Sequence, residues 1–207
     1  MKENQIRCIF FDLGNVLVEL DHDKLRDRMI SMTGLEVEQL MDALTAGGLV
    51  LKYEVGAFSD DEFLAEICSR AGVRINPSDF REAWNCIFAE KPLLSDAVLL
   101  ELSGRLPLWI LSNTNKIHFE FLRDRFRILS DYFQGWILSY EVGAAKPDPP
   151  IYMRALRRAG FSANEVLFID DQLANVEAAK KLGMNAFQCL NSTQLIQELQ
   201  NRRLLFS

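Results

Sequence analysis

The strongest hydrophobic pattern in the chain is the run IRCIFFDL at Ile6–Leu13. Cys8 and Phe10 fall on one face of an extended segment. Ile9 and Phe11 fall on the other face, so both faces are apolar. This pattern is typical of a central parallel strand that helices cover on both sides. Shorter apolar runs predict four further strands, at Leu106–Leu111, Gly135–Leu138, Val166–Ile169 and Ala186–Leu190.

Segments with a helical pattern separate these strands. They are expected at about 95–104, 116–127, 149–159, 173–182 and 192–203. Gly160 and Gly183 follow two of them, in the place where glycine commonly ends a helix. Strands that alternate with helices predict an α/β fold, with a doubly wound parallel sheet.

One interval between predicted strands is too long for a simple connection. The first strand ends near Leu13 and the second begins near Leu106, whereas a crossover needs only about a dozen residues. Segment 95–104 already supplies that crossover. We therefore predict that residues 20–90 form a small inserted helical cap, and that residues 1–19 and 91–207 form the α/β core.

The predicted cap has helical features of its own. Two helices are indicated by apolar residues at helical spacing, which are Leu25, Met29 and Met32 for the first and Leu35, Leu40 and Leu44 for the second. Ser59 and Glu62 form an S-D-D-E capping box before a third apolar stretch. Ser78 is expected to cap a last helix over Phe80–Phe88.

Composition and charge narrow the kinds of partner. Apolar residues make up 49% and charged residues 25% of the 207 residues, which is ordinary for a globular protein. The net charge is −6 and no basic stripe appears, which argues against nucleic acid as a partner. No apolar run approaches the roughly 18 residues of a membrane span, so no membrane association is expected. Four widely spaced cysteines without a C-x-x-C pair predict reduced thiols and a cytoplasmic location.

Polar residues follow the predicted strands at one edge of the sheet, where ligand sites of open parallel sheets lie. In chain order they are Asp12, Ser112 with Asn113, Lys146, and Asp170 with Asp171. Carboxylate oxygens are the preferred ligands of a hard cation such as Mg²⁺. Hydroxyl, amide and ammonium donors suit phosphate oxygens. An aspartate beside Mg²⁺ can attack as a nucleophile and form an aspartyl-phosphate.

Four segments resemble the motifs of the haloacid dehalogenase-like hydrolases, in that family's order and spacing. They are FDLGNVL at 11–17, LSNTN at 111–115, KPDPPIY at 146–152 and FIDDQLANVEAAKKLGM at 168–184. The insertion lies where that superfamily places its helical C1 cap, and the resemblance covers the whole chain. It extends to the subgroup of α-D-glucose 1-phosphate phosphatases, which share D-L-G-N-V, S-N-T-N and the cap pattern E-x-G-x-x-S, here Glu54, Gly56 and Ser59.

The resemblance implies a role for each residue that matches a motif. Asp12 matches the nucleophile, and Lys146 matches the lysine that neutralises the charge of nucleophile and phosphate. Ser112 and Asn113 match the residues that bind the phosphoryl group together with that lysine. The implied ligands of Mg²⁺ are Asp12, the backbone carbonyl of Gly14, Asp170 and Asp171.

Gly14 departs from the family pattern, because most phosphatases of the superfamily have an aspartate there as general acid and base. A glycine cannot protonate a leaving group, and such help is typically worth about 10²–10⁴-fold in rate. The departure therefore favours leaving groups that depart easily, such as the anomeric oxygen of a sugar 1-phosphate. Asp21, His22 and Asp23 are candidate donors but are expected to be solvated or capping residues. His118 is expected to cap or pack, with a contact to substrate or lid as the alternative.

Three functions are compatible with these residues. The first is a Mg²⁺-dependent phosphomonoesterase for a small phosphorylated metabolite, acting through an aspartyl-phosphate at Asp12. The second is a 2-haloacid dehalogenase, which uses the same aspartate without metal. Paired Asp170 and Asp171 disfavour it, because a metal-free site gains nothing from carboxylates beside an anionic substrate. The third is a catalytically silent binding or regulatory module, for which Gly14 is the only support. The oligomeric state stays open.

Overall fold

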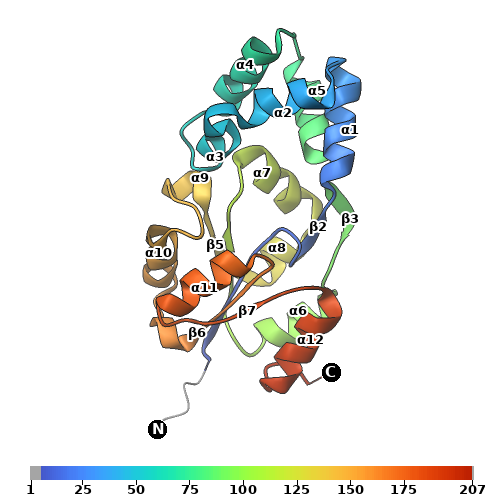
Figure 1. Cartoon of the computed structure of the whole chain (residues 1–207). Coiled ribbons are helices and arrows are strands. Elements are labelled where there is room, and N and C mark those ends of the chain that lie inside the picture. The colour runs from blue at the N-terminus through green and yellow to red at the C-terminus, as the bar shows by residue number, and fades with distance from the viewer. Residues whose placement is uncertain (1–5, 207) are drawn as a thin grey trace.

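The computed structural model describes residues 6–206 and has a parallel sheet at its centre (Figure 1). The sheet has five strands in the order β5-β4-β1-β6-β7. Their bounds are Cys8–Phe11 for β1, Leu108–Ser112 for β4, Phe133–Leu138 for β5, Val166–Asp170 for β6 and Asn185–Gln188 for β7. Each strand overlaps one of the predicted apolar runs. The predicted α/β fold, a doubly wound parallel sheet with an inserted helical cap, is confirmed.

Strand β1 lies in the middle of the sheet because both of its faces are apolar. Its four residues, Cys8 to Phe11, are all 0% exposed. Ile9 and Phe11 belong to one hydrophobic cluster, and Cys8 and Phe10 belong to another. Parallel pairing with β4 and β6 fixes the strand between them. Asp12 follows β1 directly and so lies at the centre of the carboxyl edge.

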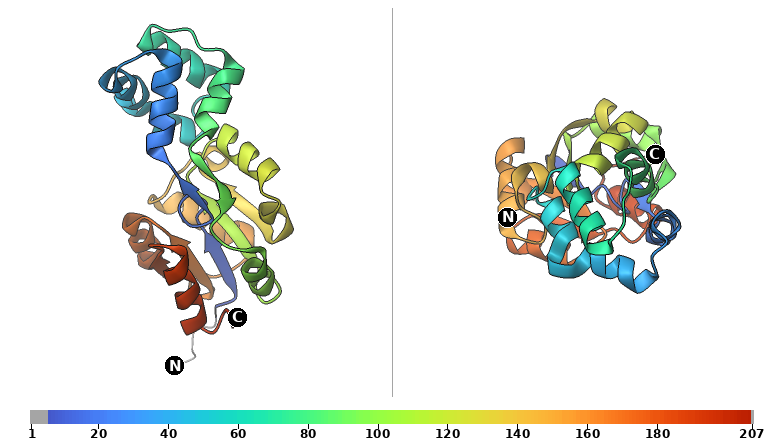
Figure 2. Two further views of the ribbon diagram at one scale, coloured as in Figure 1. Left: turned by 90° about the vertical axis from the view of Figure 1, so that its right-hand side faces the viewer. Right: turned by 90° about the horizontal axis from the view of Figure 1, so that it is seen from above.

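Helices cover both faces of this sheet (Figures 1 and 2). Helices that contribute to the cluster of Ile9 and Phe11 cover one face, and those that contribute to the cluster of Cys8 and Phe10 cover the other. The first group is α6 Asp96–Ser103, α7 Lys116–Arg125, α8 Ile128–Asp131 and α12 Ser192–Asn201. The second group is α10 Pro149–Ala159 and α11 Leu173–Lys181. Two short elements, α9 Ser139–Val142 and the 3₁₀ helix η2 Ala163–Glu165, complete the core.

The inserted cap is a separate helical layer beyond the carboxyl edge of the sheet (Figure 2). Its elements are α1 His22–Thr33, α2 Val37–Thr45, η1 Ala46–Gly48, α3 Leu49–Glu54, α4 Asp60–Ala71 and α5 Pro77–Asn85. These helices share a hydrophobic cluster that includes Met29, Phe63 and Trp84. The rings of Tyr53 and Phe63 stack with their centroids 4.0 Å apart. The cap is thus held together by its own apolar interior.

A two-stranded antiparallel ribbon, which the sequence did not predict, joins the cap to the core. It pairs β2 Val18–Leu20 with β3 Phe88–Pro92. The predicted domain boundaries at residues 20 and 90 fall within this ribbon. The expected helix over Phe80–Phe88 was too long, because α5 ends at Asn85 and Phe88 pairs with Leu20 instead.

The helix caps of the insertion were predicted with mixed success. The Ser59–Glu62 capping box is confirmed: Glu62 N donates to Ser59 Oγ at 3.3 Å, and Ser59 N donates to Glu62 Oε2 at 2.8 Å. Ser78 as an N-cap was wrong. Asn76 caps α5 by accepting from Ser78 N at 2.9 Å, and proline occupies the first helical turn.

The helices and the cysteines were the subject of two further predictions, on membrane spans and on disulfides. Within residues 6–206, none of the helices combines the length and the hydropathy that crossing a bilayer requires. All four cysteines are free thiols, as expected from their spacing.

Candidate active site

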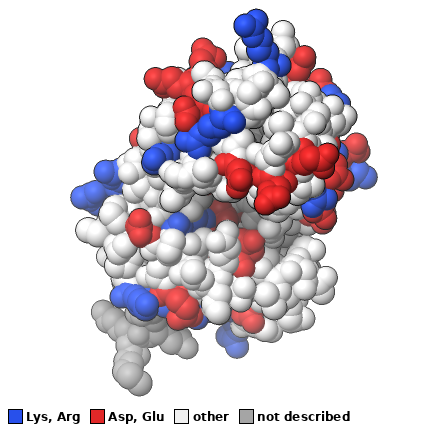
Figure 3. Space-filling view, turned by 45° about the horizontal axis from the view of Figure 1, so that its top comes forward, with Lys and Arg blue, Asp and Glu red and all other residues white. Residues whose placement is uncertain are grey.

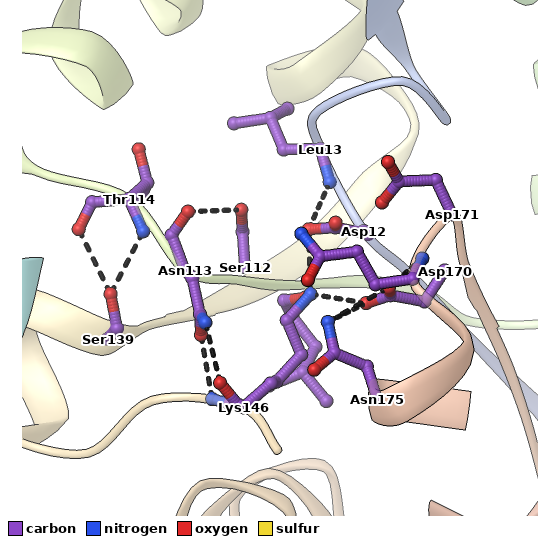
Figure 4. Close-up of polar contacts among 12 residues, drawn as sticks. Asp12, Leu13, Ser112, Asn113, Thr114, Ser139, Lys146, Asp170, Asp171 and Asn175 are labelled. Carbon is purple, nitrogen blue, oxygen red and sulfur yellow. Dashed lines mark hydrogen bonds and ion pairs between the residues drawn. The ribbon is translucent and has the colours of Figure 1, made fainter. Parts of the chain in front are cut away.

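Side chains from the ends of three neighbouring strands converge at the carboxyl edge of the sheet (Figure 4). Asp12 follows β1, Ser112 is the last residue of β4, and Asp170 is the last residue of β6. All three are buried, with exposed fractions of 7%, 1% and 0%. Lys146 reaches the same point from the loop after α9 and is 4% exposed. The structure thus brings together four of the residues that the sequence pattern singled out.

Lys146 is the cation at the centre of this group. Its Nζ lies 2.8 Å from Asp12 Oδ1 and 2.6 Å from Asp170 Oδ2, and it donates to the carbonyl of Leu111 at 2.9 Å. Burial disfavours the charged ammonium, but the two carboxylates outweigh that cost and raise the pKa of Lys146 above its ordinary value. Lys146 is therefore protonated at neutral pH, and it neutralises charge from both carboxylates.

Opposing effects act on the pKa of the Asp12 carboxyl group. Burial, together with the negative charge of Asp170, raises the pKa of Asp12 to about 6. The charge and hydrogen bond of Lys146 oppose this rise, as does the N–H of Leu13, which donates to Asp12 Oδ1 at 2.7 Å. Asp12 is consequently mostly ionised at neutral pH and only partly solvated, which suits a nucleophile.

Asp170 and Asp171 are adjacent in sequence but differ in their surroundings. Both oxygens of Asp170 accept hydrogen bonds: Oδ1 accepts from Gln172 N at 2.8 Å, Oδ2 accepts from Lys146, and each also accepts from Asn175 Nδ2. Asp171 is only half-buried, and its Oδ2 accepts one bond of 3.1 Å from Asn15 Nδ2. Asp171 therefore has free acceptor capacity, whereas Asp170 is committed to protein donors.

These carboxylates form the one cluster of possible metal ligands found within residues 6–206. Asp12, Asp170 and Asp171 each offer an oxygen, and these oxygens lie within 4.8 Å of one another. Three carboxylates with a single lysine leave an excess of negative charge. Such a set of hard oxygen ligands fits a small divalent cation.

The side chain of Asn113 is bonded to the backbone of Lys146. Lys146 N donates to Asn113 Oδ1 at 2.7 Å, and Asn113 Nδ2 donates to the carbonyl of Lys146 at 2.8 Å. These two bonds hold the lysine loop against the end of β4. The hydroxyl of Ser112 makes only a long bond of 3.4 Å, to the carbonyl of Asn113, so it keeps hydrogen-bonding capacity for a further partner. Phosphate binding by Ser112 and Asn113 stays a prediction.

Comparison with known proteins decides the family. A family model described as haloacid dehalogenase-like hydrolase matches residues 6–183. The chain belongs to the haloacid dehalogenase-like hydrolases.

A curated protein and a solved structure, both from Bacteroides thetaiotaomicron, are similar to this hydrolase over most of its length. A D-ribitol-5-phosphate phosphatase is 29% identical over 199 residues, which cover 94% of this chain and 97% of the relative. A crystal structure of a haloacid dehalogenase-like family enzyme in complex with magnesium and inorganic phosphate superposes with a TM-score of 0.81 at 29% identity. That match covers 88% of this chain and 93% of the other.

Dehalogenases share the fold of this hydrolase more distantly. The crystal structure of a 2-haloacid dehalogenase from Pseudomonas syringae matches with a TM-score of 0.66 at 22% identity. The alignment covers 95% of this chain and 99% of that one. This is a likeness of fold alone.

Asn15 is a site residue that the sequence did not single out. It adopts a left-handed backbone conformation with φ of 54°. Its Oδ1 accepts from Leu20 N at 3.0 Å while its Nδ2 donates to Asp171. Asparagine tolerates this conformation better than most residues. An asparagine directly after Gly14 was therefore the sequence signal for a tight turn at this point. Asn15 ties the loop after β1 to the carboxylate cluster.

The candidate proton donors near the start of the cap have other partners. Asp21 caps α1 by accepting from Lys24 N at 2.9 Å. Asp23 forms an ion pair with Arg26 at 2.6 Å and is well exposed. His22 is the first residue of α1 and is exposed. The described contacts of these residues are those of helix-capping and surface groups.

His118, on α7, joins the core to the cap. One ring nitrogen lies 3.0 Å from the carbonyl of Trp84, and the other lies 3.1 Å from Asn115 Nδ2. The imidazole also stacks on the indole of Trp84, with centroids 5.3 Å apart. His118 therefore packs against the cap helix α5, and the contact with the lid is part of this packing.

We expect His118 to make stability depend on pH. Burial lowers its pKa from 6.5 to about 4 in the folded protein, while hydrogen bonding to Trp84 opposes the shift. Below pH 6.5 the unfolded chain takes up a proton that the folded protein resists, so stability is lost as the pH falls from 6.5 toward 4. The slope approaches about 1.4 kcal/mol per pH unit. Urea denaturation at several pH values should show a steeper acid decline for the wild type than for His118→Gln. Parallel curves would contradict this role of His118.

Proposed function

We propose that this protein is a Mg²⁺-dependent phosphomonoesterase that works through an aspartyl-phosphate on Asp12. The observation that carries the proposal is the pairing of a buried, lysine-bound Asp12 with a cluster of carboxylates within 4.8 Å. A nucleophile, a charge-neutralising cation and a metal site then occupy one sheet edge. The family and the named phosphatase relative support the same reaction class.

The residues present fit Mg²⁺ as the resident cation. Asp12 and Asp171 would hold it through carboxylate oxygens with free acceptor capacity. The backbone carbonyl of Gly14, in the loop after β1, would add a further ligand. Asp170 would contribute mainly by orienting Lys146, because its oxygens are already bonded. When bound, the cation would offset the negative charge of the phosphoryl oxygens.

The protein's own groups have distinct parts in the proposed reaction. The Asp12 carboxylate attacks phosphorus, and the bond from phosphorus to the leaving oxygen breaks. Lys146, within 2.8 Å of Asp12, stabilises the charge that gathers on the phosphoryl oxygens. The hydroxyl of Ser112 is available to donate a hydrogen bond to the same group. Water then hydrolyses the aspartyl-phosphate and restores Asp12.

The carboxylate cluster argues against the dehalogenase alternative. A haloacid is an anion, and the carboxylates of Asp170 and Asp171 close to Asp12 would repel it unless a cation were bound. The dehalogenase similarity stands at 22% identity and does not extend beyond the fold. The turnover assay that tests the phosphatase also tests the third alternative, because a catalytically silent binding module would release no phosphate.

We propose that the substrate is a small phosphorylated sugar or sugar alcohol. A sugar 1-phosphate is one candidate, because Gly14 has no side chain that could donate a proton to the leaving oxygen. D-ribitol-5-phosphate, which names the relative's activity, has a primary alkyl phosphate instead. A screen with Mg²⁺ should therefore compare p-nitrophenyl phosphate, sugar 1-phosphates and terminal sugar or alditol phosphates. Inorganic phosphate release from none of them would contradict the proposed function.

Removing a proposed metal ligand should raise the Mg²⁺ requirement. Asp171→Ala deletes a half-buried carboxylate whose nearest donor is Asn15, so we expect little effect on folding. The Mg²⁺ concentration for half-maximal activity should rise by at least about 10-fold, since one of few hard ligands is lost. EDTA should silence the wild type. Asp131→Asn, an exposed carboxylate far along the chain on α8, serves as the control. Full wild-type turnover in EDTA would contradict the metal-dependent mechanism.

A further inference from the structure

The cap brings the acidic residue Glu54 close to its contact with the core. Glu54 is the last residue of α3, and the segment that follows packs directly on α9. Gly56 approaches α9 so closely that a Cβ atom there would lie 2.3 Å from the carbonyl oxygen of Tyr140. Its φ of +76° is one that glycine adopts readily. This close backbone contact fixes where α3 ends relative to the core.

The core element that receives this segment belongs to the active-site edge. Helix α9 begins at Ser139, directly after β5. Ser139 is 0% exposed, accepts from Thr114 N at 2.9 Å and donates to the carbonyl of Thr114 at 3.0 Å. Those bonds link α9 to the loop that follows Ser112 at the end of β4 and begins with Asn113 (Figure 4). Glu54 is therefore anchored next to the strand ends rather than on the outer side of the cap.

The carboxyl group of Glu54 is unusual among the acidic residues of the described chain. It is half-buried, and no hydrogen bond or ion pair joins it to any residue within 6–206. It lines a cavity of about 350 Å³ together with mostly apolar cap residues such as Met29, Leu40 and Trp84. The hollow between cap and core, around which acidic side chains gather, is visible in Figure 3. A carboxyl group without a protein partner is free to meet a ligand.

Burial and a nearby negative charge both favour the protonated form of Glu54. Burial, and then the negative charge of Asp12, raises the pKa of Glu54 to about 7. From the core, Asp12 is paired with Lys146, and His118 of α7 lines the same cavity. From α1, the residues His22, Asp23 and Arg26 line the cavity as well. At neutral pH a large share of Glu54 side chains therefore carries a transferable proton.

We propose that Glu54 is the proton donor to the leaving oxygen, supplied by the cap in place of the side chain that Gly14 lacks. The proposal rests on the phosphomonoesterase function proposed above. It makes Glu54 a catalytic residue of the same site. It also removes the restriction to easily departing leaving groups that Gly14 alone suggests.

The proton balance of the two steps is simple. In the first step Asp12 bonds to phosphorus, the bond from phosphorus to the alcohol oxygen breaks, and the Glu54 carboxylic acid gives its proton to that oxygen. In the second step the Glu54 carboxylate takes a proton from water as the water oxygen bonds to phosphorus. The bond between Asp12 and phosphorus breaks, which releases inorganic phosphate and restores both carboxyl groups. No further reactant is needed.

A leaving-group series tests this assignment. We expect Glu54→Gln to lower kcat/KM for primary alkyl phosphates by about 10²–10⁴-fold, because a basic oxygen needs the proton. For p-nitrophenyl phosphate, whose leaving oxygen needs no proton, kcat/KM should stay within a few-fold of wild type. The wild type should show a shallow dependence on leaving-group pKa. Asp61→Asn removes an exposed cap carboxylate at the pocket of Gly56 and Tyr140 and should leave both values unchanged.

A second readout separates proton transfer from a structural effect. If Glu54 also deprotonates water, Glu54→Gln should release p-nitrophenolate in a burst of one equivalent, followed by slow turnover. Equal losses on aryl and alkyl phosphates without a burst would overturn the role of Glu54. So would an unchanged alkyl phosphate rate. Failure of the wild type to hydrolyse any phosphate would instead count against the proposed function itself.

Discussion

Asp12→Asn should reduce phosphatase turnover to background, a loss of at least about 10⁴-fold, because an amide cannot form the acyl-phosphate. The fold should survive the change. Lys146 keeps its 2.6 Å ion pair with Asp170, and the amide oxygen can still accept from Leu13 N. Steady-state hydrolysis of p-nitrophenyl phosphate and a thermal melt would measure both effects. Turnover near the wild-type rate in a folded variant would show that another group attacks phosphorus.

Lys146→Met should cost both activity and stability. The Lys146 side chain is 1% exposed and its ammonium lies between Asp12 and Asp170, so its removal leaves two buried carboxylates that repel each other. Breaking a buried ion pair from one side costs about 3–5 kcal/mol. We also expect turnover to fall by at least about 10³-fold, because the phosphoryl charge loses its nearest cation. Urea denaturation and phosphate release would measure the two losses.

Two further variants serve as comparisons for the loss of stability in Lys146→Met. Lys180→Met removes an exposed ammonium that pairs with Glu177 at 3.0 Å, and it should change stability by less than about 1 kcal/mol. Lys146→Met combined with Asp170→Asn should recover part of the stability, because one of the two buried charges is gone, but no activity. A Lys146→Met protein as stable as Lys180→Met would contradict the buried charge arrangement described here.

The sheet could be predicted because each strand has a strong local signal. The run around Ile9 and Phe10 is apolar on both faces, which only a central strand satisfies. The ribbon of β2 and β3 gave no such signal. Val18–Leu20 has three residues, too few to show a period, and its pairing with Phe88 depends on where the cap helices end. The helix α3, which carries Glu54, was likewise short enough to be missed.

The candidate site was predictable as a set of residues but not as an arrangement. Parallel strands end at the same edge, so the meeting of Asp12, Ser112 and Asp170 follows from topology. The different environments of Asp170 and Asp171 do not, because alternation along a strand end sends neighbouring side chains in different directions. The bonds from Asn113 to the backbone of Lys146 depend on how two loops, distant in sequence, come together.

In the proposed reaction, Asp12 accepts the phosphoryl group of the substrate as an aspartyl-phosphate when Mg²⁺ is present. The most direct test is to mix the wild type with Mg²⁺ and p-nitrophenyl phosphate, quench in acid, reduce any acyl-phosphate with borohydride and map the peptides by mass spectrometry. We predict that position 12 alone is converted to homoserine, and that EDTA or Asp12→Asn prevents the conversion. Rapid phosphate release with position 12 unmodified, or conversion at another carboxylate, would contradict the claim.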